Sequence, residues 1–389
     1  MHSDGTRTAW GLVLALWAAG LGAAAQYGKI SVIFDRMAAL YPEAGTSIGF
    51  TVSLVGFLGL LLGVVAGACV AAFGYRRTIV AALWAGAAMS LFQALQPPFA
   101  AFLLSRVVEG LSHLGLVVAI PTLIAQISAE RDRGLTLTLW GTFFGVAFTI
   151  LAWAGLPIVA RFGPLALFAV HGAFMAIMAI GLQRAMRGIT VTDRPAMPAL
   201  TDLPSIHLQI YRSPRISAPA AGWVFYTACF VAILTVLPPF IDAEIRAFVL
   251  GAMPLASILS SLTIGVFALR HVSAVTVIMA GFVCCVLCMV WLWFAPGAPS
   301  ACLALAASMG LVQGASFAAV PQLNNTAADR ARANGAMAQA GNFGNTLGTP
   351  FMVAILAVGG YGLLTWTVAA LFALGIAVHV LLAMRRRIV

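Results

Sequence analysis

The feature that most restricts the fold of this chain is its series of long apolar stretches. A helix that crosses a bilayer needs about 20 apolar residues, and the sequence offers twelve such stretches. They lie at residues 9–33, 46–72, 78–95, 99–127, 135–159, 164–185, 216–240, 247–269, 272–295, 299–322, 334–358 and 361–384. Charged residues make up only 8% of the 389 positions, whereas soluble domains carry about 25%. The sequence therefore predicts an all-α integral membrane protein with twelve transmembrane helices.

The net charge of +10 raises the question of a nucleic-acid partner, but the placement of the basic residues gives another explanation. With the N-terminus in the cytoplasm and twelve crossings, sixteen of the 21 Lys and Arg residues fall on the cytoplasmic side. They are Arg7, Arg76, Arg77, Arg131, Arg133, Arg184, Arg187, Arg194, Arg212, Arg215, Arg270, Arg330, Arg332, Arg385, Arg386 and Arg387. Cytoplasmic loops of membrane proteins carry this excess. We therefore expect a multi-pass protein of a bacterial inner membrane, with both termini cytoplasmic and no nucleic-acid partner.

The longest polar connection, residues 186–215, falls between the sixth and seventh apolar stretches. It contains four prolines and several charges and has no helical period, which is typical of a linker. It divides the chain into an N-terminal six-helix bundle at 1–185 and a C-terminal six-helix bundle at 216–389. Equal halves of this kind favour an internal repeat.

A short repeat supports the division into halves. "IPTLIAQISAERDRG" at 120–134 aligns with "VPQLNNTAADRARANG" at 320–335. Both begin with Pro-x-Leu, both carry Arg-x-Arg before a glycine, and both connect the fourth stretch of their half to the fifth. Because six stretches separate the copies, the two halves are predicted to have the same direction in the membrane.

Two parallel six-helix halves joined by a polar linker resemble the major facilitator superfamily of secondary transporters. The superfamily's loop between helices 2 and 3 reads approximately G-x-L-A-D-R-x-G-R-R-R, and this chain has "GACVAAFGYRR" at 67–77. The matching positions, which the resemblance identifies as a gating loop, are Gly67, Gly74, Arg76 and Arg77. The acidic residue that holds one gating state in the superfamily is replaced by Ala71.

Two further helices match the superfamily in part. "SRVVEGLSH" fits its helix 4 pattern R-x-x-x-G through Arg106 and Gly110. The antiporter signature of helix 5 is only half present, because Val146 stands where the pattern has proline. The resemblance implies alternating access by rocking of the two bundles, a small-molecule substrate, helices 1, 4, 7 and 10 around a central cavity, and a functional monomer.

Glycines repeat at helical spacing in two predicted helices that face each other in the superfamily. They are Gly59, Gly63 and Gly67 in helix 2, and Gly341, Gly344 and Gly348 in helix 11. Small residues permit close approach of helices in lipid. We expect either a smooth surface on which the halves move or a static packing seam.

Ionisable residues cluster in two apolar stretches of the first half. Arg106, Glu109 and His113 lie three and four positions apart, so a helix places them within about 60° on one face. Lys29 and Gln26 share a face of the first helix at a similar depth. Ionisable residues inside a bilayer point to a protein interior or a water-filled cavity. Glu109 is therefore expected to pair with Arg106, with Lys29, or with both.

This cluster has two interpretations. The structural one is a buried ion pair that only fixes helix packing. In the functional one, Glu109 carries the coupling proton, because burial and neighbouring cations change the proton affinity of a carboxyl group. Lys29 and Arg106 together exceed Glu109 by one charge, which favours an anionic substrate held by the Arg fork. His113 binds substrate or relays protons, and the other helical histidines, His171 and His379, are assigned to packing.

The second half offers uncharged polar groups that we predict to contact substrate together with Gln26. They are Tyr226 in helix 7, Gln313 in helix 10, and Gln339 and Asn342 in helix 11. Amides also bind helices to one another, so packing is the alternative for each.

The sequence also argues against other classes of function. It has no nucleotide-binding G-x-x-x-x-G-K-[ST] motif, no H-E-x-x-H metal motif and no convergent nucleophile and base. The six cysteines lie in apolar stretches and are expected to be packing thiols. We therefore predict no enzyme activity, no cofactor and no metal. The preferred function is proton-coupled symport of a small organic anion, and the alternative is proton-coupled efflux of drugs or metabolites.

Overall fold

A computed structural model describes residues 7–187 and 203–388. Within these ranges the chain forms helices and connections, with no strand. The N-terminal helices are α1 (Trp10–Ser31), α2 (Phe34–Leu40), α3 (Gly49–Ser53), α4 (Phe57–Phe73), α5 (Tyr75–Gln93), α6 (Phe99–Ile127), α7 (Arg133–Gly141), α8 (Phe143–Ile150), α9 (Leu156–Phe162) and α10 (Pro164–Ala185). The C-terminal helices are α11 (Leu203–Arg212), α12 (Ser217–Val236), α13 (Arg246–Ser260), α14 (Val266–Leu269), α15 (Ala274–Phe294), α16 (Pro299–Leu323) and α17 (Ala327–Ile388).

Short turns of other helix types complete these elements. Three-residue to seven-residue 3₁₀ segments are η1 (Pro42–Ile48), η2 (Leu54–Gly56), η3 (Glu130–Asp132) and η6 (Pro238–Phe240). Two π-turns, η4 (Leu151–Gly155) and η7 (Ser261–Gly265), continue α8 and α13. Such irregular turns inside a helix often mark functional hinges.

The all-helical membrane fold is confirmed. Among the described residues, ten segments are long and apolar enough to cross a membrane. α5 is not one of them, because its first turn is polar, and the 62-residue α17 counts as one although Gly360 breaks it with φ of 63°. The helices nevertheless cover each of the twelve predicted stretches, and the number of crossings stays a prediction.

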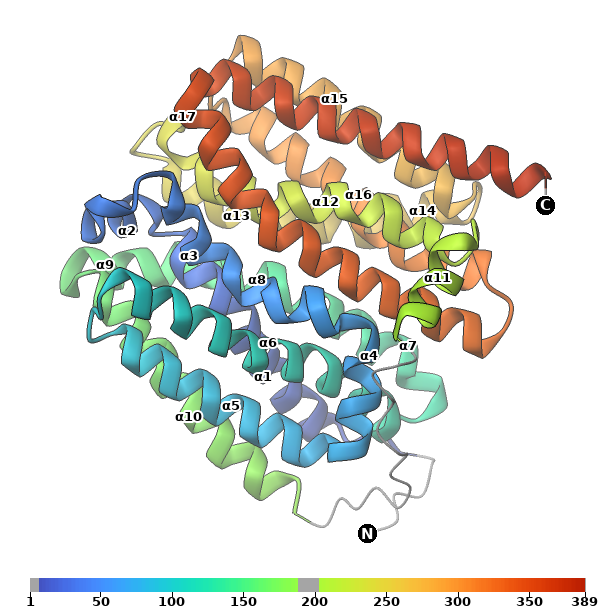
Figure 1. Ribbon diagram of the computed structural model, residues 1–389, viewed down its shortest axis with the longest axis horizontal. Coiled ribbons are helices and arrows are strands. Elements are labelled where there is room, and N and C mark those ends of the chain that lie inside the picture. The colour runs from blue at the N-terminus through green and yellow to red at the C-terminus, as the bar shows by residue number, and fades with distance from the viewer. Residues whose placement is uncertain (1–6, 188–202, 389) are drawn as a thin grey trace.

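The helices of the two predicted halves gather in different parts of the molecule (Figure 1). The blue to green helices occupy the lower part of the view and the yellow to red helices the upper part. Most of the connection between them, residues 188–202 of the predicted 186–215 linker, lies outside the described residues. The described part of the linker contains α11 (Leu203–Arg212), so the expectation of no helical period is wrong there. The domain boundaries at 185 and 216 stay predictions.

Glycine and proline explain where several helices begin and end. Gly74 separates α4 from α5 with φ of 100°, and Gly163 separates α9 from α10 with φ of 84°. Residues with a Cβ avoid this region. Pro164 and Pro299 each occupy the first position of a helix, where proline's missing N–H is not needed.

Two glycines of α4 allow α17 to approach closely. A Cβ added at Gly63 would lie 3.0 Å from the Cα of Gln339, and one added at Gly59 would collide with the Asn342 side chain. This seam joins an N-terminal helix to a C-terminal helix, as predicted for helices 2 and 11. Gly67, one turn further along, has no atom within 4 Å of such a Cβ.

The expected role of the α17 glycines in this seam is wrong. A Cβ at Gly341 would lie 2.8 Å from the Trp223 indole nitrogen, and Cβ atoms at Gly344 and Gly348 would collide with α12. These glycines therefore face α12, in the same half, while Gln339 and Asn342 on another face of α17 meet α4. Helical spacing predicts that the glycines share one face of the helix, but it does not predict which helix packs against that face.

Hydrogen bonds also join the two halves. The Ser31 and Thr235 hydroxyl oxygens are 2.7 Å apart, between the ends of α1 and α12. Thr149 in α8 donates to the carbonyl oxygen of Gly251 in α13 at 2.8 Å. With the predicted orientation, these contacts lie toward the extracellular ends of their helices.

Candidate functional site

A carboxylate inside the N-terminal helices binds two cations. Lys29 in α1 donates to Glu109 Oε1 at 2.6 Å, and Arg106 in α6 donates to Glu109 Oε2. All three side chains have an exposed fraction of 0%. The predicted pairing of Glu109 with both cations is therefore present in the structure.

Arg106 also binds three backbone carbonyl groups. Its Nε donates to Thr51 O at 2.7 Å, and its Nη2 donates to Gln26 O at 2.6 Å and to Val52 O at 3.3 Å. Thr51 and Val52 belong to α3, where the second span begins with the irregular turns η1 and η2. The guanidinium thus joins α1, α3 and α6, and its planar set of donors suits this arrangement.

Lys29 reaches two further polar groups. Its ammonium donates to Ser90 Oγ in α5 at 2.5 Å and lies 3.4 Å from His171 Nδ1 in α10. It also lies over the Phe168 ring, 5.3 Å from its centroid. A buried ammonium needs this number of partners, because burial of an unpaired charge is very costly.

Amide side chains complete the carboxylate's surroundings. Gln93 in α5 donates to Glu109 Oε2 at 2.9 Å and to Ser105 Oγ at 3.0 Å. Gln26 in α1 donates to Ser112 Oγ at 2.8 Å, one turn further along α6. We refer to Lys29, Ser90, Gln93, Arg106, Glu109 and His171 as the Glu109 network.

The Glu109 network carries one more positive than negative charge when its histidine is neutral. Two cations share one carboxylate, one on each oxygen. The next ionisable group along α6, His113, is also buried, with an exposed fraction of 6%. The single carboxylate is thus the counter-ion of both buried cations.

His113 lies beside this network and has a different partner. Its Nδ1 is 3.0 Å from the carbonyl oxygen of Ala23, so Nδ1 carries the hydrogen and donates it. Its ring contacts the Tyr27 ring edge-on, with centroids 5.1 Å apart. Among the described residues, neither His113 Nε2 nor the Tyr27 hydroxyl has a hydrogen-bond partner.

A row of aromatic side chains crosses from the N-terminal to the C-terminal helices. Within this row, the two halves meet where Phe144 in α8 contacts Phe230 in α12, with ring centroids 6.2 Å apart. From the His113–Tyr27 pair, successive rings are Phe144, Phe230, Tyr226, Trp223 and Phe317. Tyr226, predicted from sequence, is therefore linked to His113 through rings but is not part of the Glu109 network.

The predicted amides of the second half lie elsewhere. Gln339 donates to Leu60 O in α4 at 3.2 Å, accepts from the Tyr211 hydroxyl of α11 at 3.0 Å and lies 3.0 Å from His207 Nε2. Asn342 donates to Ala338 O and packs over Gly59. Gln313 in α16 is half-buried. The predicted substrate-binding residues therefore do not lie in one place: they are found around Glu109, in the aromatic row, between α4 and α17, and in α16.

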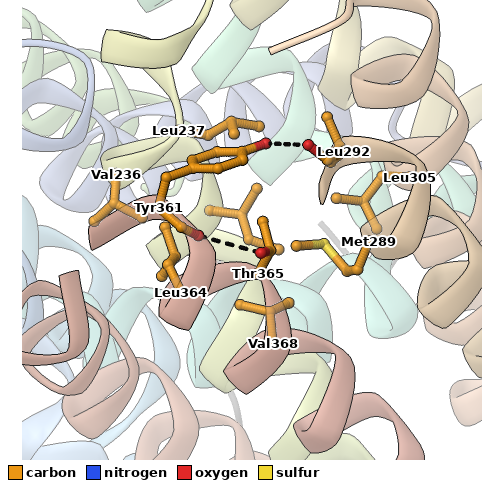
Figure 2. A pocket seen from close by; sticks show the side chains of 10 residues that line it. Val236, Leu237, Met289, Leu292, Leu305, Tyr361, Leu364, Thr365 and Val368 are labelled. Carbon is orange, nitrogen blue, oxygen red and sulfur yellow. Dashed lines mark hydrogen bonds between the residues drawn. The ribbon is translucent and has the colours of Figure 1, made fainter. Parts of the chain in front are cut away.

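A small apolar pocket lies among the C-terminal helices (Figure 2). Its lining includes Met289, Leu305, Leu364 and Val368, and no charged side chain. The Tyr361 hydroxyl donates to the carbonyl oxygen of Leu292 at 2.8 Å (Figure 2). The pocket offers no group for a charged ligand and is separate from the Glu109 network.

Comparison with known families now adds to the geometry. A sequence model described as Major Facilitator Superfamily matches residues 12–323. The chain belongs to this superfamily. It is therefore a multi-pass membrane protein and a secondary transporter of small molecules, in a family that is generally without enzyme activity. A search of curated proteins finds no match.

The superfamily's gating loop lies at the junction of α4 and α5. Gly74 has the positive φ that the turn requires, and Arg76 donates to Gln183 O in α10 at 3.3 Å. Arg77 is exposed. Ala71 stands where other members have an acidic residue, and it cannot form a charge contact, so the gating role of this loop stays a prediction.

The sequence did not predict three members of the network. His171 is assigned to packing from the sequence, but it is buried within hydrogen-bond distance of Ser90 and Lys29. Ser90 and Gln93 lie three residues apart on one face of α5. A polar pair at this spacing in an apolar helix was the available signal, and it resembles the spacing of Arg106 and Glu109.

Proposed function

We propose that this transporter carries a small organic anion together with a proton, by alternating access, across a bacterial inner membrane. Both termini would be cytoplasmic, and the functional unit would be a monomer. The observation that carries the proposal is the sharing of one buried carboxylate by two cations, Lys29 and Arg106.

The shared carboxylate explains how proton and anion would be coupled. When Glu109 is ionised, Lys29 and Arg106 are both occupied by its oxygens. When Glu109 gains a proton, the two cations lose their partner, and an anionic substrate then binds in its place. By linkage, the anion also favours the protonated carboxyl. Proton and anion would therefore move in the same direction.

The substrate would lie between the network and the aromatic row. His113 has an uncommitted Nε2 at the start of this row, and Gln26 has a buried Oε1 without a partner among the described residues. Tyr226, in the aromatic row, would contact the substrate from the C-terminal half. Gln313, Gln339 and Asn342 lie elsewhere in this structure and would contact it after rearrangement of the helices. In the structure Lys29 and Arg106 are fully buried, so the binding state requires a rearrangement of α1 and α6.

Two transport assays distinguish a role of Glu109 in proton coupling from a role in substrate binding. Purified protein would be placed in liposomes with labelled lactate, succinate and gluconate, and proton-driven uptake would be compared with counterflow exchange. Glu109→Gln mimics the protonated carboxyl, so we expect exchange to persist and proton-driven accumulation to be lost. Unchanged accumulation would show that Glu109 only packs helices, and absence of transport for all three anions would refute the substrate class.

One observation favours the alternative, proton-coupled efflux of drugs or metabolites. The aromatic row presents large rings to the interface between the halves, and Phe317 at its end is 53% exposed. Apolar and aromatic compounds bind such surfaces. Loss of drug tolerance in a deletion strain, restored by wild-type protein but not by Phe317→Ala, would support this alternative.

A further inference from the structure

The His171 ring has a defined tautomer in the Glu109 network. Its Nε2 lies 2.9 Å from the carbonyl oxygen of Gly22, which can only accept a hydrogen bond. Nε2 therefore carries the hydrogen when the ring is neutral, and Nδ1 presents a lone pair. This lone pair lies 2.6 Å from the Ser90 hydroxyl.

Ser90 connects this lone pair to the charged centre. Its oxygen accepts from Lys29 Nζ at 2.5 Å, which leaves its single hydrogen to donate to His171 Nδ1. The alternative acceptor, Glu109 Oε1, is further away at 3.4 Å. The hydrogen bonds thus run in one direction, from the Lys29 ammonium through the Ser90 hydroxyl to the imidazole.

We propose that His171 is a second proton-carrying group of this transporter, loaded through Ser90. In the transfer, Lys29 gives a proton to Ser90 Oγ as Ser90 gives its own to His171 Nδ1. Lys29 becomes a neutral amine and His171 an imidazolium, so charge and protons balance. The inference rests on the proposed proton coupling at Glu109 and extends it to a second group.

Charged groups from two helices face His171. The ionisable groups that face it are Lys29 from α1, and Glu109 and Arg106 from α6. Ser90 from α5 is its polar neighbour. When Glu109 gains a proton, Lys29 loses its carboxylate partner, and transfer to His171 moves the surplus charge away from Arg106. A neutral Lys29 then receives the next proton from Glu109, which restores the carboxylate.

The chain offers matched variants for a test. His171→Gln keeps one donor and one acceptor but cannot be protonated, and Ser90→Ala removes the connecting hydroxyl. Ser90→Thr retains that hydroxyl. His379→Gln is the control, because His379 is a fully buried histidine of α17 with no hydrogen-bond partner among the described residues.

Each variant would be measured in liposomes with labelled lactate, succinate and gluconate, after its folding is checked by size exclusion. We expect His171→Gln and Ser90→Ala to lower proton-driven uptake at least about tenfold, with counterflow exchange unchanged. The double variant should be no slower than either, Ser90→Thr should retain more uptake than Ser90→Ala, and His379→Gln should behave as wild type.

The outcomes separate this inference from the proposed function. If Glu109→Gln loses accumulation while His171→Gln and Ser90→Ala keep it, the relay is refuted and the coupling role of Glu109 stands. If the histidine and serine variants lose exchange and uptake equally, their role is structural and the relay is also refuted. If none of the three anions moves with wild-type protein, the proposed function and this inference both fail.

Discussion

The charge arithmetic of the Glu109 network makes a quantitative prediction for stability. Glu109→Gln leaves Lys29 and Arg106 as two buried cations without an anion, and loss of one partner of a buried ion pair costs about 3 to 5 kcal/mol. Lys29→Met leaves Arg106 balanced by the carboxylate and removes mainly hydrogen bonds, at a cost of about 1 to 3 kcal/mol. Removal of the anion should therefore destabilise the fold more than removal of a cation.

A double-mutant cycle isolates the Lys29–Glu109 interaction. At the 2.6 Å separation of Nζ and Oε1, their attraction is about 6 kcal/mol at an effective dielectric constant of about 20. Desolvation offsets part of this, and close charge pairs show measured couplings of about 1.5 to 7 kcal/mol. We expect about 3 kcal/mol of coupling between Lys29→Met and Glu109→Gln.

The assay is unfolding of each variant in mixed micelles with increasing SDS, followed by tryptophan fluorescence. The partly exposed Asp329–Arg332 pair, separated by 3.3 Å in α17, is the control, and its coupling should stay below about 1 kcal/mol. Equal costs for Glu109→Gln and Lys29→Met, or a coupling no larger than that of the control pair, would refute the reasoning.

Three other predictions concern the seam between α4 and α17, helix α11, and the Gly74 turn between α4 and α5. Gly63→Leu should abolish transport because its side chain meets the Gln339 backbone, whereas Gly67→Leu, at a position with open space, should retain it; both are read from uptake in liposomes. Tyr211→Phe removes the hydrogen bond from α11 to Gln339. Without this restraint we expect the two halves to separate more often, so a thiol reagent should label a cysteine placed between them faster; an unchanged labelling rate would contradict this. Gly74→Ala places a Cβ at φ of 100° and should lower stability by about 1 to 3 kcal/mol in the SDS titration, and an unchanged midpoint would contradict the need for glycine there.

Much of the fold and the centre of the site could be predicted from the sequence. The apolar stretches determine where helices lie, since length and hydropathy are local properties. Glu109 could be assigned to Arg106 and Lys29 because helical spacing fixes one face of α6 and membrane topology fixes the depth of Lys29. Both arguments need only a single helix and the direction of the chain.

The remainder depends on how each helix is rotated against its neighbours. His171 and Ser90 join Lys29 because of the rotations of α10 and α5. The spacing of Ser90 and Gln93 marks a polar face of α5 but not the helix that it meets, and His171 has no polar neighbour at helical spacing. Gly344 faces α12 rather than α4 for the same reason. The bonds of Gln339 to α11 and α4 follow from packing that no local pattern records, and its contact with substrate stays a prediction.

The most direct test of the proposed coupling is proton uptake on anion binding. Purified transporter in weakly buffered detergent solution, with a pH indicator, would be mixed with lactate, succinate or gluconate. The proposal predicts that wild-type protein takes up protons as the anion binds, and that Glu109→Gln binds the anion without proton uptake. Anion binding without proton uptake by wild-type protein, or equal uptake by Glu109→Gln, would contradict it.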